Sequence, residues 1–264
     1  MKKFTNKVVW ITGASSGIGY ALAQELYNEG AYLALSARRV DKLQDLVNSL
    51  GERAKLYELD VRNKEQNSKV ANLIAKDFGK IDIVIANAGY SVVGKFANIS
   101  EESWLGLFAT NVFGVVWTLQ AAIEYIKQTK GSLVITSSVA GKIAIGNTTA
   151  YAASKFAVSA LGNGLYQELY PHEVAVSVIY PGLIQSEIAK VDNQGVYHEE
   201  RLDKRSHFFM WPADKAAKVI AKGIYRRKRE IIVTKHAVLA DFLVRFLPSL
   251  LYLLLAKFQY KSRK

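Results

Sequence analysis

A short apolar run, a glycine-rich turn and a helix follow one another near the start of the chain and constrain its fold strongly. The run Lys7–Thr12 predicts a β-strand, and the turn Gly13-Ala14-Ser15-Ser16-Gly17-Ile18-Gly19 precedes a helical pattern that ends at Gly30. Glycines permit a tight turn and a close backbone approach to a ligand, while the helix N-terminus presents free N–H groups to a pyrophosphate. This order of elements therefore predicts a nucleotide-binding turn.

The end of the second predicted strand, residues 31–37, indicates which nucleotide binds. A carboxylate at this place would hold the ribose 2′-hydroxyl of NAD, whereas an arginine accommodates the 2′-phosphate of NADP. Ala37 offers no acid, and Arg38 and Arg39 follow it. Two guanidinium groups can hold a phosphate through paired hydrogen bonds. The pair favours NADP(H) over NAD(H); the alternative is a solvated pair at the start of the next helix.

Strand and helix patterns alternate through most of the chain. Helices are predicted over 41–50 and 64–78 and from Ser100 onward, and strands over 54–59, 81–86, 133–136 and 174–179. Repeated units of this kind predict one α/β domain of the Rossmann type, a doubly wound parallel sheet of about seven strands with helices on both faces. We expect this catalytic domain to span residues 1–235.

Ligands of such sheets bind beyond the carboxyl ends of the strands. The predicted strand ends carry the glycine-rich turn, Arg38, Asp60-Val61, Asn87-Ala88-Gly89, Ser138 and Pro181-Gly182, so these groups should converge on one edge. The small residues after the fourth strand leave room for a flat ligand. Asp60 can accept a hydrogen bond from an adenine amino group, or it is simply a turn residue.

A serine, a tyrosine and a lysine near the fifth strand are candidates for proton transfer. Tyr151 and Lys155 lie one helical turn apart, and an ammonium beside a phenol lowers the phenol pKa from about 10. Such a phenol can pass a proton to or from a substrate oxygen, which Ser138, thirteen positions earlier, can share. Asn111 interrupts an apolar helix; it holds a kink or a water, or it is a satisfied core amide.

Together these motifs resemble those of the short-chain dehydrogenase/reductase family. The resemblance covers about residues 5–235 and rests on Thr12-Gly13-x-x-x-Gly17-x-Gly19, Asp60-Val61, Asn87-Ala88-Gly89, Asn111, Ser138, Tyr151-x-x-x-Lys155 and Pro181-Gly182. It implies that Tyr151 is the general acid/base, that Ser138 steadies the substrate oxygen, and that Lys155 lowers the tyrosine pKa and binds the nicotinamide ribose. Asn111 would hold a water in a proton relay.

Two positions depart from the family pattern. Ala86 replaces the first asparagine of the usual Asn-Asn-Ala-Gly, and Ser186 stands where a threonine usually contacts the nicotinamide carboxamide. Neither change removes a catalytic group, and Ser186 retains a hydroxyl. The implied cofactor contacts are Gly13, Ser15, Ser16, Gly17, Ile18, Gly19, Arg38, Arg39, Asp60, Val61, Asn87, Ala88, Gly89, Tyr151, Lys155, Pro181, Gly182, Ile184 and Ser186.

Two segments lie outside these motifs. Residues 183–211 form a long connection of mixed polarity, which by the resemblance would be a lid over the substrate. The extension 236–264 is apolar and basic, and Pro248 should break or kink its helical stripe, which consists of Leu239, Phe242, Leu243, Phe246, Leu250, Leu253 and Leu254. Its uncharged run is too short to span a membrane. Three interpretations remain for 237–258: a membrane-interface helix, a cover of the substrate mouth or of a subunit interface, or a core helix.

Composition limits the other function classes. A net charge of +12 suits nucleic acid, an anionic membrane surface or a phosphorylated ligand. No nucleic-acid module is recognisable, and the run Arg226–Arg229 is typical of a solvated helix end. The chain has no cysteine, and its four histidines lack zinc-ligand spacing, so we expect no metal site. An apolar strand pattern from Val8 onward leaves no room for a signal peptide, which favours a cytoplasmic location.

The sequence thus predicts an NADP(H)-dependent oxidoreductase that interconverts a carbonyl and a secondary alcohol. Membrane-attached lipid and steroid reductases of the resembled family carry similar hydrophobic additions, which implies an apolar, lipid- or steroid-like substrate. We expect a homo-oligomer, with peripheral membrane contact through 237–264 and no nucleic-acid partner. The alternative is a non-catalytic NADP-binding sensor or scaffold that attaches to a membrane or partner through its extension.

Overall fold

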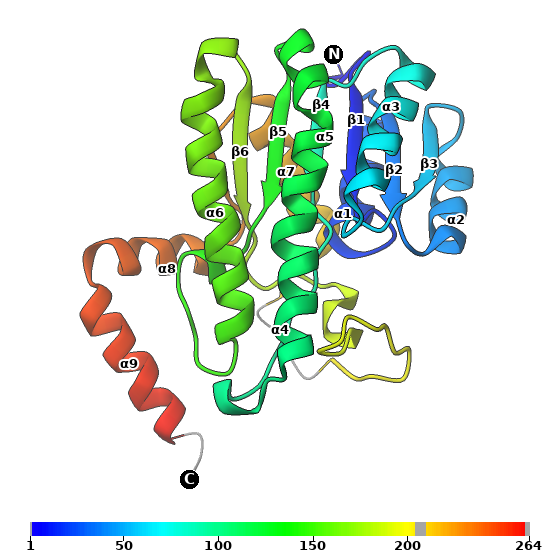
Figure 1. Ribbon diagram of the computed structural model, residues 1–264. Coiled ribbons are helices and arrows are strands. Elements are labelled where there is room, and N and C mark those ends of the chain that lie inside the picture. The colour runs from blue at the N-terminus through cyan, green and yellow to red at the C-terminus, as the bar shows by residue number, and fades with distance from the viewer. Residues whose placement is uncertain (1, 204–209, 262–264) are drawn as a thin grey trace.

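A computed structural model, which describes residues 2–203 and 210–261, shows one parallel sheet with helices on both faces (Figure 1). The sheet has the strand order 3-2-1-4-5-6-7. Its strands are β1 (Val8–Thr12), β2 (Tyr32–Ala37), β3 (Ala54–Glu58), β4 (Ile83–Ala86), β5 (Ser132–Thr136), β6 (Ala175–Tyr180) and β7 (Glu230–Ile232). The Rossmann-type fold that the alternating pattern predicted is confirmed.

Both faces of the sheet are buried, so alternate side chains of one strand pack into two different hydrophobic cores. In β1, Val9 and Ile11 pack with α1 (Gly17–Asn28), α2 (Val40–Leu50) and α7 (Ala213–Tyr225). Val8 and Trp10 point to the opposite face, toward α3 (Lys64–Phe78), α5 (Gly114–Thr129) and α6 (Thr149–Leu169). Continuous apolar strands are typical of parallel sheets that helices cover on both sides.

Strands β1 and β4 lie side by side where the order of the sheet reverses. β1 pairs with β2 on one side and with β4 on the other. The helices that follow these two strands depart in opposite directions, which leaves a crevice beyond the carboxyl ends of the strands. The glycine-rich turn follows β1 and Asn87 follows β4. The fold therefore brings both motifs to the same crevice.

One long helical stretch combines α4 (Glu101–Phe108), a π turn (Ala109–Phe113) and α5. In the described part of the chain, this stretch alone is long and apolar enough to cross a membrane by length and composition. That is weak evidence, because buried core helices pass the same test, and Val115, Leu119 and Ile126 pack against the sheet. Short 3-10 turns lie at Phe96–Asn98, Val139–Gly141, Tyr170–His172 and Glu187–Lys190.

After β7 the chain forms α8 (Lys235–Phe246) and α9 (Pro248–Lys261), which project from the body of the molecule (Figure 1). The break before Pro248 confirms the predicted interruption. The predicted apolar stripe, however, does not pack into the body: Phe242, Phe246 and Leu254 are 54%, 67% and 55% exposed. The interpretation of this stripe as an ordinary core helix is therefore wrong.

Candidate functional site

The glycine-rich turn packs closely against the segment that follows β4. A Cβ atom on Gly13, which has φ +67°, would lie 2.8 Å from Ala88 Cα, and one on Gly19 would lie 2.4 Å from the Gly13 carbonyl oxygen. Asn87 Nδ2 donates to the carbonyl oxygen of Thr12 at 3.0 Å, and the Asn87 N–H donates to Thr12 Oγ1 at 3.1 Å. Only glycine allows this close approach, so no side chain from Gly13 or Gly19 occupies the space at the N-terminus of α1.

The loop after β6 reaches the same turn. A Cβ atom on Gly17, which also has a positive φ of 56°, would lie 3.1 Å from Ser186 Cβ. The carbonyl oxygen of Pro181 accepts the Val139 N–H at 2.9 Å, which ties this loop to the segment that follows β5. The predicted motifs after β1, β4, β5 and β6 therefore share one edge of the sheet.

Lys155 is the buried cation of this edge. Its side chain is 4% exposed, and Nζ donates to the carbonyl oxygen of Thr136 at 2.9 Å. Nζ lies 5.7 Å from the centroid of the Tyr151 ring, and a Cβ atom on Gly89 would be 3.5 Å from it. Burial disfavours the charged form and lowers the pKa of the Lys155 ammonium to about 8. The structure thus brings the Tyr151–Lys155 pair against the Asn87–Gly89 segment.

The two serines at the end of β5 have different surroundings. Ser137 Oγ donates to the carbonyl oxygen of Lys155 at 2.9 Å and lies 2.9 Å from Ser159 Oγ, so this hydroxyl anchors α6. Ser138 Oγ accepts the Ala140 N–H at 3.1 Å, and its own contact with the Pro181 carbonyl oxygen is long, at 3.5 Å. The arrangement supports Ser138 as the serine with a hydroxyl to offer a substrate.

Asn111 lies inside the π turn and is fully buried. Its Oδ1 accepts the Tyr90 N–H at 3.0 Å, and its Nδ2 donates to the Tyr90 carbonyl oxygen at 2.9 Å and to Ser154 Oγ at 3.1 Å. The amide is therefore a satisfied core amide at a helix distortion, as two of the sequence alternatives stated. The water relay stays a prediction, and the π turn, which interrupts the regular helical bonds, is the part of the backbone suited to it.

The two arginines after β2 contact the connection that follows β6. Arg39 Nη2 donates to Ser15 Oγ at 3.2 Å and to Glu187 Oε2 at 2.9 Å. Arg38 Nη2 donates to the carbonyl oxygen of Gly195 at 3.1 Å. Arg39 Nη1 is buried, yet it has no partner within the part of the chain that the structure describes. A buried donor without a partner beside Ser15 suits an anionic group of a ligand.

Asp60 already has a strong partner in the structure. Arg62 donates from Nε to Asp60 Oδ1 at 3.0 Å and to Oδ2 at 2.9 Å. Burial would raise the pKa of Asp60, but the hydrogen bonds from Arg62 outweigh it and hold this pKa below its ordinary value. The turn interpretation thus has direct support, and the contact with an adenine amino group stays a prediction.

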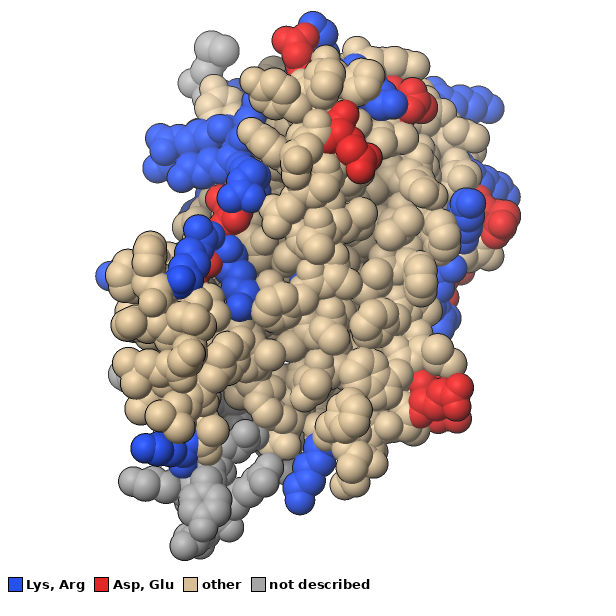
Figure 2. Space-filling model, turned by 60° about the vertical axis from the view of Figure 1, so that its left-hand side comes forward, with Lys and Arg blue, Asp and Glu red and all other residues tan. Residues whose placement is uncertain are grey.

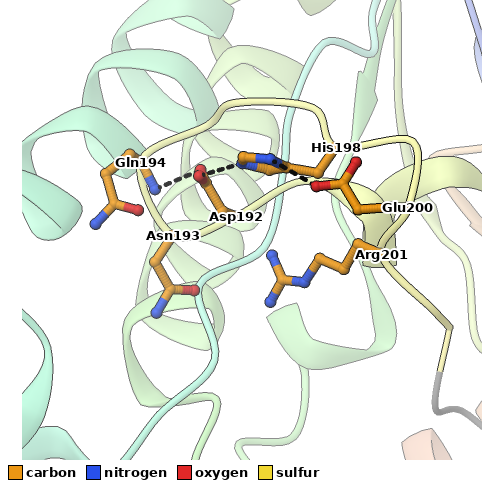
Figure 3. A pocket seen from close by; sticks show the side chains of 6 residues that line it. All are labelled: Asp192, Asn193, Gln194, His198, Glu200 and Arg201. Carbon is orange, nitrogen blue, oxygen red and sulfur yellow. Dashed lines mark hydrogen bonds and ion pairs between the residues drawn. The ribbon is translucent and has the colours of Figure 1, made fainter.

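The predicted lid, residues 183–211, is described except for 204–209, which include His207 and lie outside the described residues. A shallow hollow on it is lined by Asp192, Asn193, Gln194, His198, Glu200 and Arg201 (Figure 3). Asp192 closes this turn on itself: its carboxylate accepts the N–H groups of Gln194 and Val196 and pairs with His198 Nε2 at 2.7 Å. None of the catalytic candidates lines the hollow, so we assign it no role in the chemistry.

Sequence reasoning missed the contribution of α8 to this edge. His236 Nε2 accepts the Leu183 N–H at 3.0 Å, and a Cβ atom on Gly182 would lie 2.3 Å from the same nitrogen. Lys142, which follows the Ser138 segment, pairs with Glu230 and Asp241, both at 2.8 Å. The start and middle of α8 therefore hold the loops that carry Gly182 and Ser138. No local pattern marks such contacts, because their partners are far apart in the sequence.

The residues present fit a dinucleotide. Any side chain at Gly13 or Gly19 would fill the space at this turn. The N-terminus of α1 beside it can receive a pyrophosphate. In residues 2–203 and 210–258, only Arg39 Nη1 and Thr136 Oγ1 are buried side-chain donors or acceptors without a partner, and both belong to this edge. Among the same residues, no cluster of three His, Cys, Asp or Glu side chains could hold a metal ion.

The sequence of this chain is similar to known oxidoreductases over most of its length. A family model described as short chain dehydrogenase matches residues 7–196. An uncharacterized oxidoreductase of Staphylococcus aureus strain N315 is 35% identical over 195 residues, which cover 73% of this chain and 84% of that protein. The chain belongs to the short-chain dehydrogenase family. As a short-chain dehydrogenase, it is a nucleotide-dependent oxidoreductase.

Solved structures of the family superpose on most of this short-chain dehydrogenase. One from Burkholderia phymatum, solved in complex with NAD, has a TM-score of 0.83 at 27% identity and covers 93% of this chain and 95% of its own. An alcohol dehydrogenase from Thermococcus sibiricus, complexed with 5-hydroxy-NADP, has a TM-score of 0.75 at 28% identity, with 86% and 95% covered. Structures of this fold are thus known with NAD in one case and with an NADP derivative in the other.

Proposed function

We propose that this short-chain dehydrogenase interconverts a carbonyl and a secondary alcohol with NADP(H), and that Tyr151 is its general acid/base. The observation that carries the proposal is the buried Lys155 ammonium, one helical turn from Tyr151 and 5.7 Å from the centroid of its ring. A positive charge held out of water beside a phenol stabilises the phenolate far more than a solvated lysine would. A homo-oligomeric state and a cytoplasmic location remain predictions from the sequence.

The chain's own residues would divide the work around one substrate oxygen. Bound nicotinamide supplies or accepts the hydride at the substrate carbon. During reduction Tyr151 gives its phenolic proton to the substrate oxygen, and during oxidation the phenolate removes that proton. Ser138 hydrogen-bonds the same oxygen and holds it in reach of the phenol. Lys155 keeps the phenolate accessible, and Asn111 fixes the segment around Tyr90 against α6 through Ser154.

We propose Arg39 and Ser15 as the groups that select NADP(H). The Arg39 guanidinium lies beside the glycine-rich turn, with Nη2 3.2 Å from Ser15 Oγ and with a buried Nη1 that has no partner in the described residues. A 2′-phosphate bound there would accept hydrogen bonds from both side chains. It would compete with Glu187, whose carboxylate now pairs with Arg39. Arg38, which donates to the carbonyl oxygen of Gly195, would add positive charge near the phosphate without contacting it.

An apolar substrate agrees with the side chains around the catalytic edge. Ile145 lies in the loop between Ser138 and Tyr151 and is 48% exposed, and Leu183, directly after Gly182, is 38% exposed. Exposed apolar side chains beside a polar reaction centre favour a substrate with a hydrophobic body and one reacting oxygen. We therefore propose a ketone or secondary alcohol of lipid- or steroid-like character.

The test is nucleotide consumption by the purified full-length protein. We expect oxidation of NADPH, followed at its absorbance band, with long-chain or polycyclic ketones and slower oxidation with short polar ketones. NADH should be used less efficiently than NADPH with the same ketone. If NADPH binds but is not consumed with any ketone or aldehyde in a broad panel, the alternative of a non-catalytic nucleotide sensor replaces the proposal.

A further inference from the structure

The helices α8 and α9 carry many large apolar side chains that the rest of the chain leaves exposed. Nine large apolar side chains in 238–258 are at least 46% exposed: Val238, Leu239, Phe242, Phe246, Leu247, Leu250, Leu253, Leu254 and Phe258. The helix α9 is apolar around most of its circumference, and the hydroxyl of Tyr252 accepts the Ala144 N–H at 3.4 Å, which joins this helix to the body. Contiguous apolar surface of this kind marks an interaction site.

The charged residues that follow Asp241 in the chain are all basic. The 23 residues that follow Asp241 contain Arg245, Lys257, Lys261, Arg263 and Lys264 and no Asp or Glu. In Figure 2 the apolar projection is bordered by Lys and Arg, and the acidic side chains near it lie at its upper end among those basic groups. Two of the acids close to α8, Asp241 and Glu230, are already paired with Arg245.

This combination selects a lipid surface rather than a second copy of the chain. Two copies that joined through α9 would bring two uniformly basic segments together, and like charges repel. Anionic headgroups would attract the same segments while acyl chains accept the apolar side chains. The apolar helix Pro248–Phe258 is too short to span a bilayer, which needs about 20 apolar residues, but it can lie in the interface.

The projection also adjoins the catalytic edge. The helix α8 packs on the 3-10 turn Val139–Gly141, directly after Ser138, and α9 contacts Ala144 in the loop that leads to Tyr151. We propose that α8 and α9 dock the protein on an anionic lipid surface and turn the sheet edge that carries Ser138 toward it. An apolar carbonyl compound would then enter the site from the bilayer. The docking stands on the surface alone; the entry route rests on the proposed function.

The test separates these two parts. Full-length protein is sedimented with vesicles of phosphatidylcholine alone or with added phosphatidylglycerol, without nucleotide or substrate. We expect binding that rises at least about tenfold with the anionic lipid and weakens with salt, because surface charges are screened over about 10 Å at 0.1 M salt. The double variant Phe246→Ser with Leu250→Ser should lose this binding. Phe96→Ser is the matched control, since Phe96 is 68% exposed and Phe246 is 67% exposed.

Each outcome decides the proposal. Absence of sedimentation with anionic vesicles would overturn it, as would a concentration-dependent dimer that the double variant abolishes and that excludes vesicles. Binding equal in Phe246→Ser/Leu250→Ser and Phe96→Ser would also overturn it. For the entry route, the double variant should reduce a vesicle-embedded ketone about tenfold more slowly than wild type, while a water-soluble ketone is reduced at an unchanged rate. Equal slowing of both ketones would contradict entry from the bilayer, even if docking holds.

Discussion

The catalytic end and the arginine end of the same sheet edge are built in different ways. Lys155 and Asn111 are buried, and their partners belong to β5, α6 and the segment after β4, which are parts of the core. Arg39 is partly exposed and contacts Ser15 and Glu187, one from a turn and one from the lid. The fold itself therefore fixes the proposed proton-transfer groups, whereas the proposed nucleotide selection depends on contacts that a ligand can rearrange.

Removal of the buried charge should give the largest effect at the catalytic end. In Lys155→Met the phenol of Tyr151 loses the ammonium that favours its phenolate, so we expect turnover to fall by about 10²–10⁴, the contribution typical of general acid–base catalysis. Steady-state rates with NADPH at saturating ketone measure the loss. The matched control is Lys218→Met, which removes an exposed lysine from α7, away from the site; turnover in Lys155→Met equal to that of Lys218→Met would remove the proposed distinction.

The pH dependence should show the same buried charge in a second way. Burial lowers the pKa of Lys155 from 10.5 to about 8 in the folded chain. Between these two values the unfolded chain binds more protons, so the contribution of Lys155 to the free energy of unfolding rises with pH. The value of kcat/KM for reduction should instead fall above about pH 8, by up to tenfold per unit, as the free enzyme loses the ammonium. Urea unfolding and initial rates at several pH values measure the two opposite trends; a kcat/KM that is flat to pH 10 would count against the role of Lys155.

At the arginine end, Arg39→Ala should change selection rather than chemistry. Loss of the bidentate donor should weaken NADPH binding by about 10–100-fold, since hydrogen bonds to charged groups contribute about 1.5–3 kcal/mol. NADH, which lacks the 2′-phosphate, should bind almost as before. Fluorescence titration of both nucleotides measures the ratio, and Lys42→Ala, on the exposed side of α2, is the control. Equal weakening of both nucleotides would indicate that Arg39 only holds the lid through Glu187.

The layered sheet and its functional edge were predictable because their signals are local. Apolar runs of fixed length separated by helical patterns determine the parallel sheet, and the strand ends then determine which motifs meet. Ser137 and Ser138 illustrate the limit of spacing arguments. Both follow β5, and only their contacts in the structure show that Ser137 anchors α6 through Lys155 and Ser159.

The remaining features depend on contacts between distant parts of the chain. The strand β7 has three residues, too few for a recognisable alternation, so no range could be predicted for the seventh strand. The role of His236 depends on Leu183, 53 positions earlier, and Glu187 reaches Arg39 across 148 positions. Whether the apolar stripe on α8 and α9 packs into the body or faces outward could not be predicted, because an apolar helical face has the same pattern in a core and on a lipid surface.

The most direct test of the central claim is Tyr151→Phe, with Tyr166→Phe in the same helix as its control. This change removes one hydroxyl and leaves the packing and the charge of Lys155 in place. We predict that NADPH binding stays within about threefold of wild type, while single-turnover hydride transfer slows by about 10³-fold or more. Tyr166→Phe should leave both quantities unchanged. Near-wild-type hydride transfer in Tyr151→Phe would contradict the account.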